Sequence, residues 1–141
     1  MAMEPGVTFG AIALDGSELF QPVRRALDVS SFGMSVISLQ PLQRLRIHRH
    51  RAQEEVYLVL SGTLTLSIEA DERQLGVGEA ARVAPAIRRQ LLNRGENLCV
   101  VLALGGHGEH EGRDGEAFVS WDESVGRPPQ EVPLPPDLPS P

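Results

Sequence analysis

The sequence contains no lysine, and all 13 of its basic residues are arginine. A chain without lysine cannot form a Schiff base with a carbonyl substrate or supply the lysine of a phosphate-binding P-loop. Its single cysteine, Cys99, excludes an internal disulfide and is compatible with a reducing compartment. We therefore expect neither lysine-based catalysis nor a disulfide-stabilised fold.

Long apolar runs and an excess of basic residues are also missing. The longest apolar run, residues 98–104, is far shorter than the ~20 residues of a membrane helix. Acidic residues outnumber basic ones by 19 to 13, whereas a nucleic-acid-binding face needs clustered basic residues. No cationic stretch precedes an apolar one near the N-terminus, so we expect no secretory signal. These absences predict a cytoplasmic protein that binds neither nucleic acid nor a membrane.

Composition divides the chain into three regions of one expected domain. Residues 1–35 mix short apolar runs with turn residues and predict N-terminal strands or an arm, and residues 36–104 are dense in short β-type runs and predict the barrel core. Residues 105–141 form a glycine-rich, acidic loop and then a tail that holds seven of the eleven prolines. Because proline excludes helix and central strand, this tail is either a disordered end or an extended segment packed along the domain or a partner subunit.

Short β-type runs recur along the middle of the chain with turn signals between them. They span residues 35–40, 44–48, 55–60, 63–68, 80–83 and 98–104. The run 63–68 alternates strictly between polar and apolar residues, whereas the run 98–104 is continuously apolar and is expected to be buried on both faces. No amphipathic helix is evident. Evenly spaced short strands predict an all-β barrel or sandwich.

Two of the four histidines lie two residues apart, at His48 and His50. Residues two apart on a strand project to the same face, so both imidazoles can converge on one ion. Glu55, at the start of the next run, adds a carboxylate. Such a set suits one divalent ion per chain, with Zn, Fe, Mn, Ni and Cu all possible. The alternative is a polar strand end in which two histidines lie by chance.

The stretch from His48 to Gly62 resembles the first motif of the cupin superfamily, which reads His-x-His, three or four residues, Glu, six residues, Gly. His48, His50, Glu55 and Gly62 meet this spacing, and Leu42 stands where the family usually has a glycine. The resemblance implies a double-stranded β-helix, which is a jelly-roll barrel. It also implies a divalent metal held inside the barrel by the two histidines and the glutamate.

The second cupin motif is present in altered form. Gly78 and Asn93 match its ends, Pro85 is shifted, and Ala86 replaces a glycine of the motif. Arg89 stands at the position of the fourth metal ligand, but a guanidinium has no lone pair to donate. At about 5 Å and an effective dielectric of ~20, a divalent ion and an arginine would repel each other by roughly 7 kcal/mol before relaxation.

Three arrangements relieve this repulsion, and the sequence leaves them open. A small anion can lie between the metal and Arg89, which then anchors a carboxylate or phosphate. Arg89 can turn away and leave a three-ligand metal with open positions. In the third arrangement the site holds no metal, and Glu55 and Arg89 form an ion pair inside the barrel. A one-residue slip of the motif would instead place Gln90, a weak oxygen ligand, in the site.

Other candidates carry weaker signals. Tyr57 shares the strand parity of Glu55, so it is either a hydroxyl contact for a ligand or a core residue. Residues 107–111 hold two histidines and two glutamates in a glycine-rich loop, where nothing fixes their geometry. Trp121, with Phe118, is expected to pin the C-terminal segment onto the barrel.

An alternating basic row precedes and follows the two histidines. It consists of Arg44, Arg46, Arg49 and Arg51. The row either pairs with acids on a neighbouring strand or a partner subunit, or it marks a solvated strand edge that resists further pairing.

Together these residues predict a metal-capable cupin that binds a small anionic molecule, with Arg89 and Tyr57 as ligand contacts and no catalytic residue assigned. One alternative is a metal-dependent oxygenase or isomerase, because two histidines and a carboxylate form the ligand set of iron oxygenases. A second is a metal-free ligand-binding or structural cupin with a Glu55–Arg89 ion pair. The resemblance also implies a homodimer, since single-domain cupins commonly form dimers.

Overall fold

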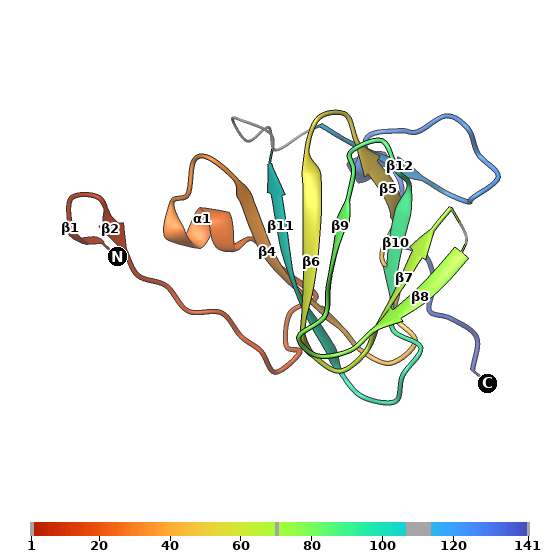
Figure 1. Ribbon diagram of the computed structural model, residues 1–141, viewed down its shortest axis with the longest axis horizontal. Coiled ribbons are helices and arrows are strands. Elements are labelled where there is room, and N and C mark those ends of the chain that lie inside the picture. Colours follow the sequence, from red (N-terminus) through yellow and green to blue (C-terminus); the bar gives the residue numbers. More distant parts are fainter. Residues whose placement is uncertain (1, 70, 107–113, 141) are drawn as a thin grey trace.

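The computed structural model describes residues 2–69, 71–106 and 114–140. Two five-stranded antiparallel sheets lie face to face (Figure 1). The first sheet contains, in spatial order, β12 (Gly115–Phe118), β5 (Ile47–His50), β10 (Arg89–Leu92), β7 (Leu64–Ile68) and β8 (Asp71–Leu75). The second contains β3 (Phe20–Gln21), β4 (Gly33–Leu39), β11 (Cys99–Gly106), β6 (Glu54–Ser61) and β9 (Ala80–Val83). This architecture confirms the predicted all-β jelly-roll barrel.

The core lies between the two sheets. Its buried members are Ile37, Leu39, Tyr57, Val59, Leu64, Leu66, Leu75, Val83, Leu91, Cys99, Val101 and Ala103. Strand β11 is buried on both faces over its first half, where Val101 faces this core and Val100 packs on the outer side in a second cluster with Val23 and Val36, whereas Leu102 and Leu104 are only partly buried. Burial raises the pKa of the Cys99 thiol to about 11, which fits an inert, structural thiol.

The second cluster is covered by a helix that the sequence analysis did not predict. Helix α1 (Val23–Leu27) is a single turn that ends at Asp28 in the left-handed conformation. One turn is too short to give a 3.6-residue periodicity, and its Val23 and Leu27 pack in the cluster with Val36 and Val100. Beyond α1, a short hairpin of β1 (Ala2–Glu4) and β2 (Val7–Thr8) lies outside both sheets.

Three strands were missed, and one strand differs from its prediction. Strands β8, β10 and β12 lie in stretches for which no β-type run was predicted. The expected polar face of β7 is not solvated, because Thr65 and Ser67 are each only 2% exposed. The alternation of polar and apolar residues along β7 therefore predicted the strand correctly, but it did not predict that the polar face is buried.

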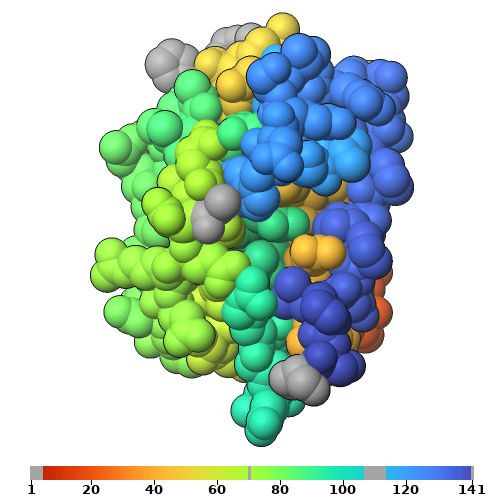
Figure 2. All heavy atoms as spheres, turned by 90° about the vertical axis from the view of Figure 1, so that its right-hand side faces the viewer, coloured from red at the N-terminus to blue at the C-terminus, as the bar shows by residue number. Residues whose placement is uncertain are grey.

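The proline-rich tail packs along the barrel rather than projecting from it. Val132 and Leu138 are buried, and Arg46 donates to the Val132 carbonyl oxygen at 2.5 Å. Arg44 donates to the carbonyl oxygen of Pro136 at 2.7 Å. Figure 2 shows the tail, in blue, along one side of the barrel. Two arginines of the basic row thus bind backbone oxygens of the tail, and η1 (Pro129–Glu131) lies within it.

Cations and aromatic rings fix the segment before the tail. Arg49 forms an ion pair with Glu116 of β12 at 3.0 Å, as the pairing interpretation of the basic row expects. The Arg88 guanidinium lies 5.2 Å from the Phe118 ring centroid and 5.6 Å from that of Trp121. Such contacts are cation–π interactions, and they hold this segment on the barrel.

The described part of the chain contains no helix that is long and apolar enough to span a membrane. Residues 107–111, the weaker metal candidate, lie outside the described residues.

Gly62 and Gly78 form a matched pair for testing the fold. Both have positive φ, at +74° and +84°, but a Cβ at Gly62 would lie 2.2 Å from the Leu98 carbonyl oxygen, whereas a Cβ at Gly78 would meet nothing within 4 Å. We expect Gly78→Ala to lower the free energy of unfolding by about 1 kcal/mol, and Gly62→Ala to lower it by about 3 kcal/mol or more because backbone must move. Urea unfolding measures both, and equal losses would contradict the close approach at Gly62.

Candidate metal site

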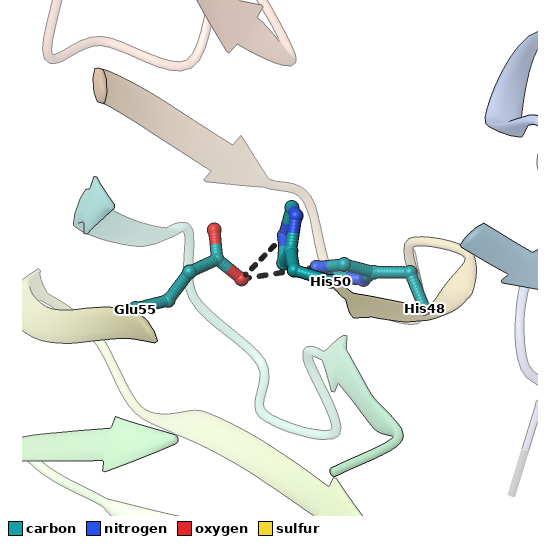
Figure 3. Close-up of side chains that lie close together, drawn as sticks. All are labelled: His48, His50 and Glu55. Atoms are coloured by element: carbon teal, nitrogen blue, oxygen red, sulfur yellow. Dashed lines mark hydrogen bonds and ion pairs between the residues drawn. The ribbon is translucent and has the colours of Figure 1, made fainter. Parts of the chain in front are cut away.

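Strands β5 and β6 bring the three predicted metal ligands together at one end of the barrel. His48 and His50 share one face of β5 in the first sheet, and Glu55 comes from β6 in the second. The His48 Nε2 lies 3.2 Å and the His50 Nε2 3.1 Å from the Glu55 Oε1, and one ligand atom of each residue falls within 4.8 Å of the others. Both rings point toward the Glu55 carboxylate (Figure 3).

The other ring nitrogen of each histidine faces an oxygen that can only accept a hydrogen bond. The His48 Nδ1 lies 3.3 Å from the Arg46 carbonyl oxygen, and the His50 Nδ1 lies 2.7 Å from the Asp114 Oδ1. In a neutral ring these oxygens favour the proton on Nδ1, so the Nε2 lone pair becomes available to a metal once the ring has lost its second proton. The rings are therefore already oriented as metal ligands.

One buried atom among the three ligand side chains has no hydrogen bond to another described residue. The His50 Nε2 is buried without a hydrogen-bond partner among the described residues, despite its short distance to Glu55. Buried polar atoms rarely stay unsatisfied in native proteins. A divalent ion between His48, His50 and Glu55 would give this nitrogen a partner, so the residues present fit a metal.

Burial and mutual charge set the protonation of the site. Burial alone raises the pKa of Glu55, but the imidazole rings of His48 and His50, which lie 3.2 Å and 3.1 Å from its carboxylate, outweigh burial and hold that pKa well below its ordinary value. Burial alone lowers the pKa of His50, yet Glu55 and Asp114 raise it above 6.5 overall. Glu55 is thus an ionised ligand, while protons compete with a metal at His50.

Tyr57 lies in the site and is also part of the core. It is 1% exposed, and its hydroxyl donates to the Glu55 Oε1 at 2.5 Å. Burial, and then the charge of Glu55, hold the pKa of Tyr57 well above 10. The phenol therefore acts here as a hydrogen-bond donor that fixes the carboxylate, not as a base.

Arg89 is buried beside the ligand set. The β10 register pairs it with His48, its exposure is 0%, and its Nη2 lies 3.5 Å from the Glu55 Oε1. The guanidinium donates to five backbone carbonyl oxygens, those of His48, Val83, Ala84, Pro85 and Ile87, at 2.8–3.5 Å. Within the part of the chain that the structure describes, its buried Nε has no hydrogen-bond partner. Arg89 thus combines parts of two expected arrangements: most of its donors turn to the backbone, and one faces Glu55.

Gln90, the residue that a slipped motif would place in the site, makes other contacts. Its side chain donates to the Leu45 carbonyl oxygen at 2.9 Å. Neighbouring residues on a strand point to opposite faces, so Gln90 faces away from the side that Arg89 occupies.

The sequence analysis missed Asp114, which lies in contact with His50. The Asp114 carboxylate is 1% exposed on its side chain and accepts hydrogen bonds from the backbone amides of Ala52 and Gln53, both at 2.9 Å, and from the Gln53 side chain at 2.6 Å. Burial alone raises the pKa of Asp114, but these donors and His50 lower it to about 2. Asp114 lies 64 residues from His50 in the sequence and belongs to no spaced motif, so the sequence does not indicate their contact.

Removal of the Asp114 charge is expected to weaken metal binding without removing a ligand. Asp114→Asn retains the shape of the side chain but loses the anion that holds the His50 proton on Nδ1. We expect about 10- to 100-fold lower metal affinity. Isothermal titration gives the affinity, and ¹⁵N NMR of the His50 ring gives its tautomer. Glu116→Gln, on the neighbouring strand β12, is the control. An unchanged tautomer and affinity would show that Asp114 supports only the fold.

Comparisons with known proteins identify the family and the fold. The model of the Cupin domain matches residues 35–105. A cupin protein from Bacteroides fragilis is 20% identical with a TM-score of 0.65, over 85% of this chain and 97% of the other. A sugar phosphate isomerase of the cupin superfamily from Silicibacter pomeroyi is 20% identical with a TM-score of 0.62, over 93% and 94%. These two likenesses establish the fold alone.

One further structure is more similar in sequence. It is provisionally named a sugar phosphate isomerase, from Acidithiobacillus ferrooxidans, and is 25% identical with a TM-score of 0.59 over 67% of this chain. This chain spans 60% of the length of that protein. No curated protein matches the sequence. The family model, the barrel and the His48–His50–Glu55 cluster lead to one conclusion: the chain belongs to the cupin family.

Proposed function

We propose that the protein binds one divalent metal ion through His48, His50 and Glu55 and holds a small anionic oxygen ligand at the open coordination positions. The observation that carries the proposal is the convergence of two Nε2 atoms and one carboxylate oxygen within 4.8 Å, with both Nδ1 atoms held by acceptors. Three protein ligands leave positions for a ligand from solution.

Charge supports an anionic ligand. The formal charges of Glu55 and Arg89 cancel, so a bound divalent ion would leave the site with a net positive charge. Arg89 is fully buried, where its charge is poorly screened by solvent. Arg89 therefore favours an anion mainly through its electric field, since its Nη atoms donate to backbone oxygens. Tyr57 stabilises the ionised form of Glu55 through its hydrogen bond.

A bound divalent ion would supply Lewis-acid polarisation of an oxygen atom of the ligand. The residues around it hold the site ready: Asp114 orients His50, and Tyr57 and Arg89 compensate the charge of Glu55. The side chains of His48, His50 and Glu55 are 16–20% exposed, so the three residues are in partial contact with solvent.

Cobalt(II) provides a direct test of this proposal. Its visible absorption reports coordination, so a 1:1 titration of the wild-type protein should develop a saturable spectrum, and His50→Ala should not. Adding a dicarboxylate such as oxalate should shift the wild-type spectrum, whereas a neutral diol of similar size should not. If the cobalt spectrum saturates but does not change when the anion is added, the metal site is supported and the proposed anionic ligand is contradicted.

Metal affinity should depend on pH through His50. Its pKa lies above 6.5, and a metal must displace its proton, so affinity should fall as pH drops below that pKa, about tenfold per pH unit for each displaced proton. Asp114→Asn removes one contribution that raises the pKa, so the decline should begin at lower pH in that variant. Titration between pH 5 and pH 8 measures both curves, and a flat profile would show that His50 is not a ligand.

A second candidate function is isomerisation of a small phosphorylated sugar. It is favoured by the 25% identity to the Acidithiobacillus protein and by the chemistry of a metal next to a carbonyl oxygen. Metal-loaded protein would be incubated with aldose and ketose phosphates in D₂O and followed by NMR. Interconversion that is lost in Glu55→Gln would support an isomerase, and its absence across both sugar series would leave binding as the function.

A further inference from the structure

Strand β5, which carries two of the three proposed metal ligands, is held mainly by the C-terminal end of the chain. Strand β12 pairs with it at four positions, whereas β10, on its other side, pairs with it at one position of the described chain, between Arg89 and His48. We call residues 114–140 the strap. The strap lies outside residues 35–105, which the family model matches. The position of β5 therefore depends on a segment beyond the matched part of the barrel.

The strap also lies against the His50 ring. The Asp114 Oδ1 is 2.7 Å from the His50 Nδ1. A Cβ at Gly115 would lie 3.6 Å from the Cε1 of that ring and 3.5 Å from the Cγ of Pro129, so the ring and Pro129 border the same small space. Pro129 begins η1, in the later part of the strap. Two separate parts of the strap thus lie next to one metal ligand.

The middle of the strap folds back on β12 and covers its free edge. Ala117 and Arg127 exchange two backbone hydrogen bonds, at 2.8 and 2.9 Å. Gly126 packs closely on Glu116, since a Cβ at Gly126 would lie 2.8 Å from the Glu116 Cβ. Phe118 is 2% exposed. Because these contacts join the middle of the strap to β12, we expect both to leave the barrel together.

Two buried apolar side chains anchor the later part of the strap. Val132 and Leu138 are 3% and 8% exposed, and the Leu138 amide donates to the Leu42 carbonyl oxygen at 2.7 Å. Leu134, between them, is 42% exposed. Neither anchor belongs to the core cluster between the two sheets. A segment with few buried apolar contacts can open while the core stays folded.

We propose that the strap completes the metal site and is coupled to it: a docked strap positions His50 for the metal, and a bound metal holds the strap on the barrel. This inference rests on the proposed function, because the coupling passes through His50 as a ligand. Undocking removes Asp114 from His50 and frees β5 from its pairing with β12, so the undocked state binds metal more weakly. Since coupling between binding and docking is reciprocal, the metal stabilises the docked strap by the same factor.

Substitutions at the far anchors test the first half of this coupling. Val132→Asp would bury a carboxylate without a partner, so it should undock the strap and lower the affinity for Zn²⁺ by at least about fivefold. Leu134→Asp places the same charge at the exposed residue between the anchors and should leave the affinity unchanged. Leu138→Asp, close to the end of the strap, should act in the same direction as Val132→Asp and keeps the test valid where Val132→Asp fails to fold.

The single tryptophan of the chain tests the second half. Trp121 lies in the strap, and its ring centroid is 5.6 Å from the Arg88 guanidinium, so its fluorescence reports docking. Saturating Zn²⁺ should lower the quenching of Trp121 by acrylamide and slow hydrogen exchange in β12. With chelator, Val132→Asp should raise the quenching, and Leu134→Asp should not. Zinc that binds the wild type without changing either signal would overturn the coupling.

Failure of the coupling and failure of the proposed function give different results. A wild-type protein that binds no Zn²⁺ would overturn both. A wild-type protein that binds Zn²⁺, with the same affinity in folded Val132→Asp and Leu138→Asp, would overturn the role of the strap and retain the metal site. Thermal unfolding with chelator shows that the barrel of each variant is folded.

Discussion

Replacing Arg89 by histidine is expected to destabilise the protein and, at the same time, to raise its affinity for a divalent ion by about 100-fold. The loss of stability follows because the guanidinium donates to five backbone oxygens and lies 3.5 Å from the Glu55 carboxylate. Breaking such a buried charge network costs about 3–5 kcal/mol. The gain in affinity follows because a cation that repels the ion is exchanged for a fourth nitrogen ligand.

Arg89→Met separates the two effects. It removes the charge and the donors but adds no ligand, so its loss of stability should match that of Arg89→His, while metal affinity rises by only about tenfold. Arg82→Met, on the exposed Glu54 pair of β9, is the control and should change neither quantity. Thermal unfolding with chelator measures stability, and competition with a chromophoric chelator measures affinity. If Arg89→His bound metal no more tightly than the wild type, Arg89 would not occupy the ligand position.

Glu55→Gln is expected to abolish metal binding at micromolar concentrations and to destabilise the protein by about 3–5 kcal/mol. The amide loses the negative charge that a divalent ion requires, and it leaves the buried Arg89 cation without its counter-charge. The same substitution also removes the carboxylate acceptor of the Tyr57 hydroxyl. Calorimetric titration gives the binding, and denaturant unfolding gives the stability.

A double-mutant cycle shows whether the stability effect comes from the ion pair. If the lost stability reflects an unpaired Arg89, then Glu55→Gln combined with Arg89→Met should be more stable than the sum of the single losses predicts, by about 1–3 kcal/mol. Tyr57→Phe removes one hydrogen bond and should cost only about 1 kcal/mol. Additive losses in the cycle would contradict a functional Glu55–Arg89 coupling.

Local sequence pattern predicted most of the strands that line the core, but it missed β10, whose Leu91 is a core residue. The runs around β4, β6, β7, β9 and β11 consist of β-branched and aromatic or alternating residues, so their periodicity was visible. Strand β8 was missed because four of its five residues, Asp71 to Gln74, are exposed and polar, as suits the edge of a sheet. It is held by its hydrogen bonds to β7. Such pairing depends on the tertiary structure and produces no periodic pattern of apolar residues in the sequence.

The ligand set was predictable because His48, His50 and Glu55 lie close together in the sequence. Residues two apart on a strand share a face in any fold, so spacing alone indicated convergence. The partners that orient these ligands were not predictable. Asp114 meets His50 because it directly precedes β12, whose Gly115 pairs with His50, and the donors of Arg89 face five backbone oxygens, which no side-chain pattern encodes.

The proline-rich tail shows a different limit of sequence pattern. Its composition excluded helix and central strand correctly, but did not decide between disorder and packing. The decision comes from Arg44 and Arg46, whose guanidinium groups donate to the carbonyl oxygens of Pro136 and Val132. These contacts join residues about 90 positions apart, and a proline-rich segment retains free carbonyl acceptors for them because it forms no helix or sheet of its own.

The most direct test of the metal site is elemental analysis of untagged protein purified without chelators, followed by dialysis against single divalent ions. We predict about one iron, manganese, nickel, copper or zinc ion per chain in the wild type, and none above background in His50→Ala and Glu55→Gln. Wild-type protein that stays free of metal after dialysis against each ion would contradict the account. The site would then hold the Glu55–Arg89 ion pair without a metal, and the protein would be a metal-free cupin.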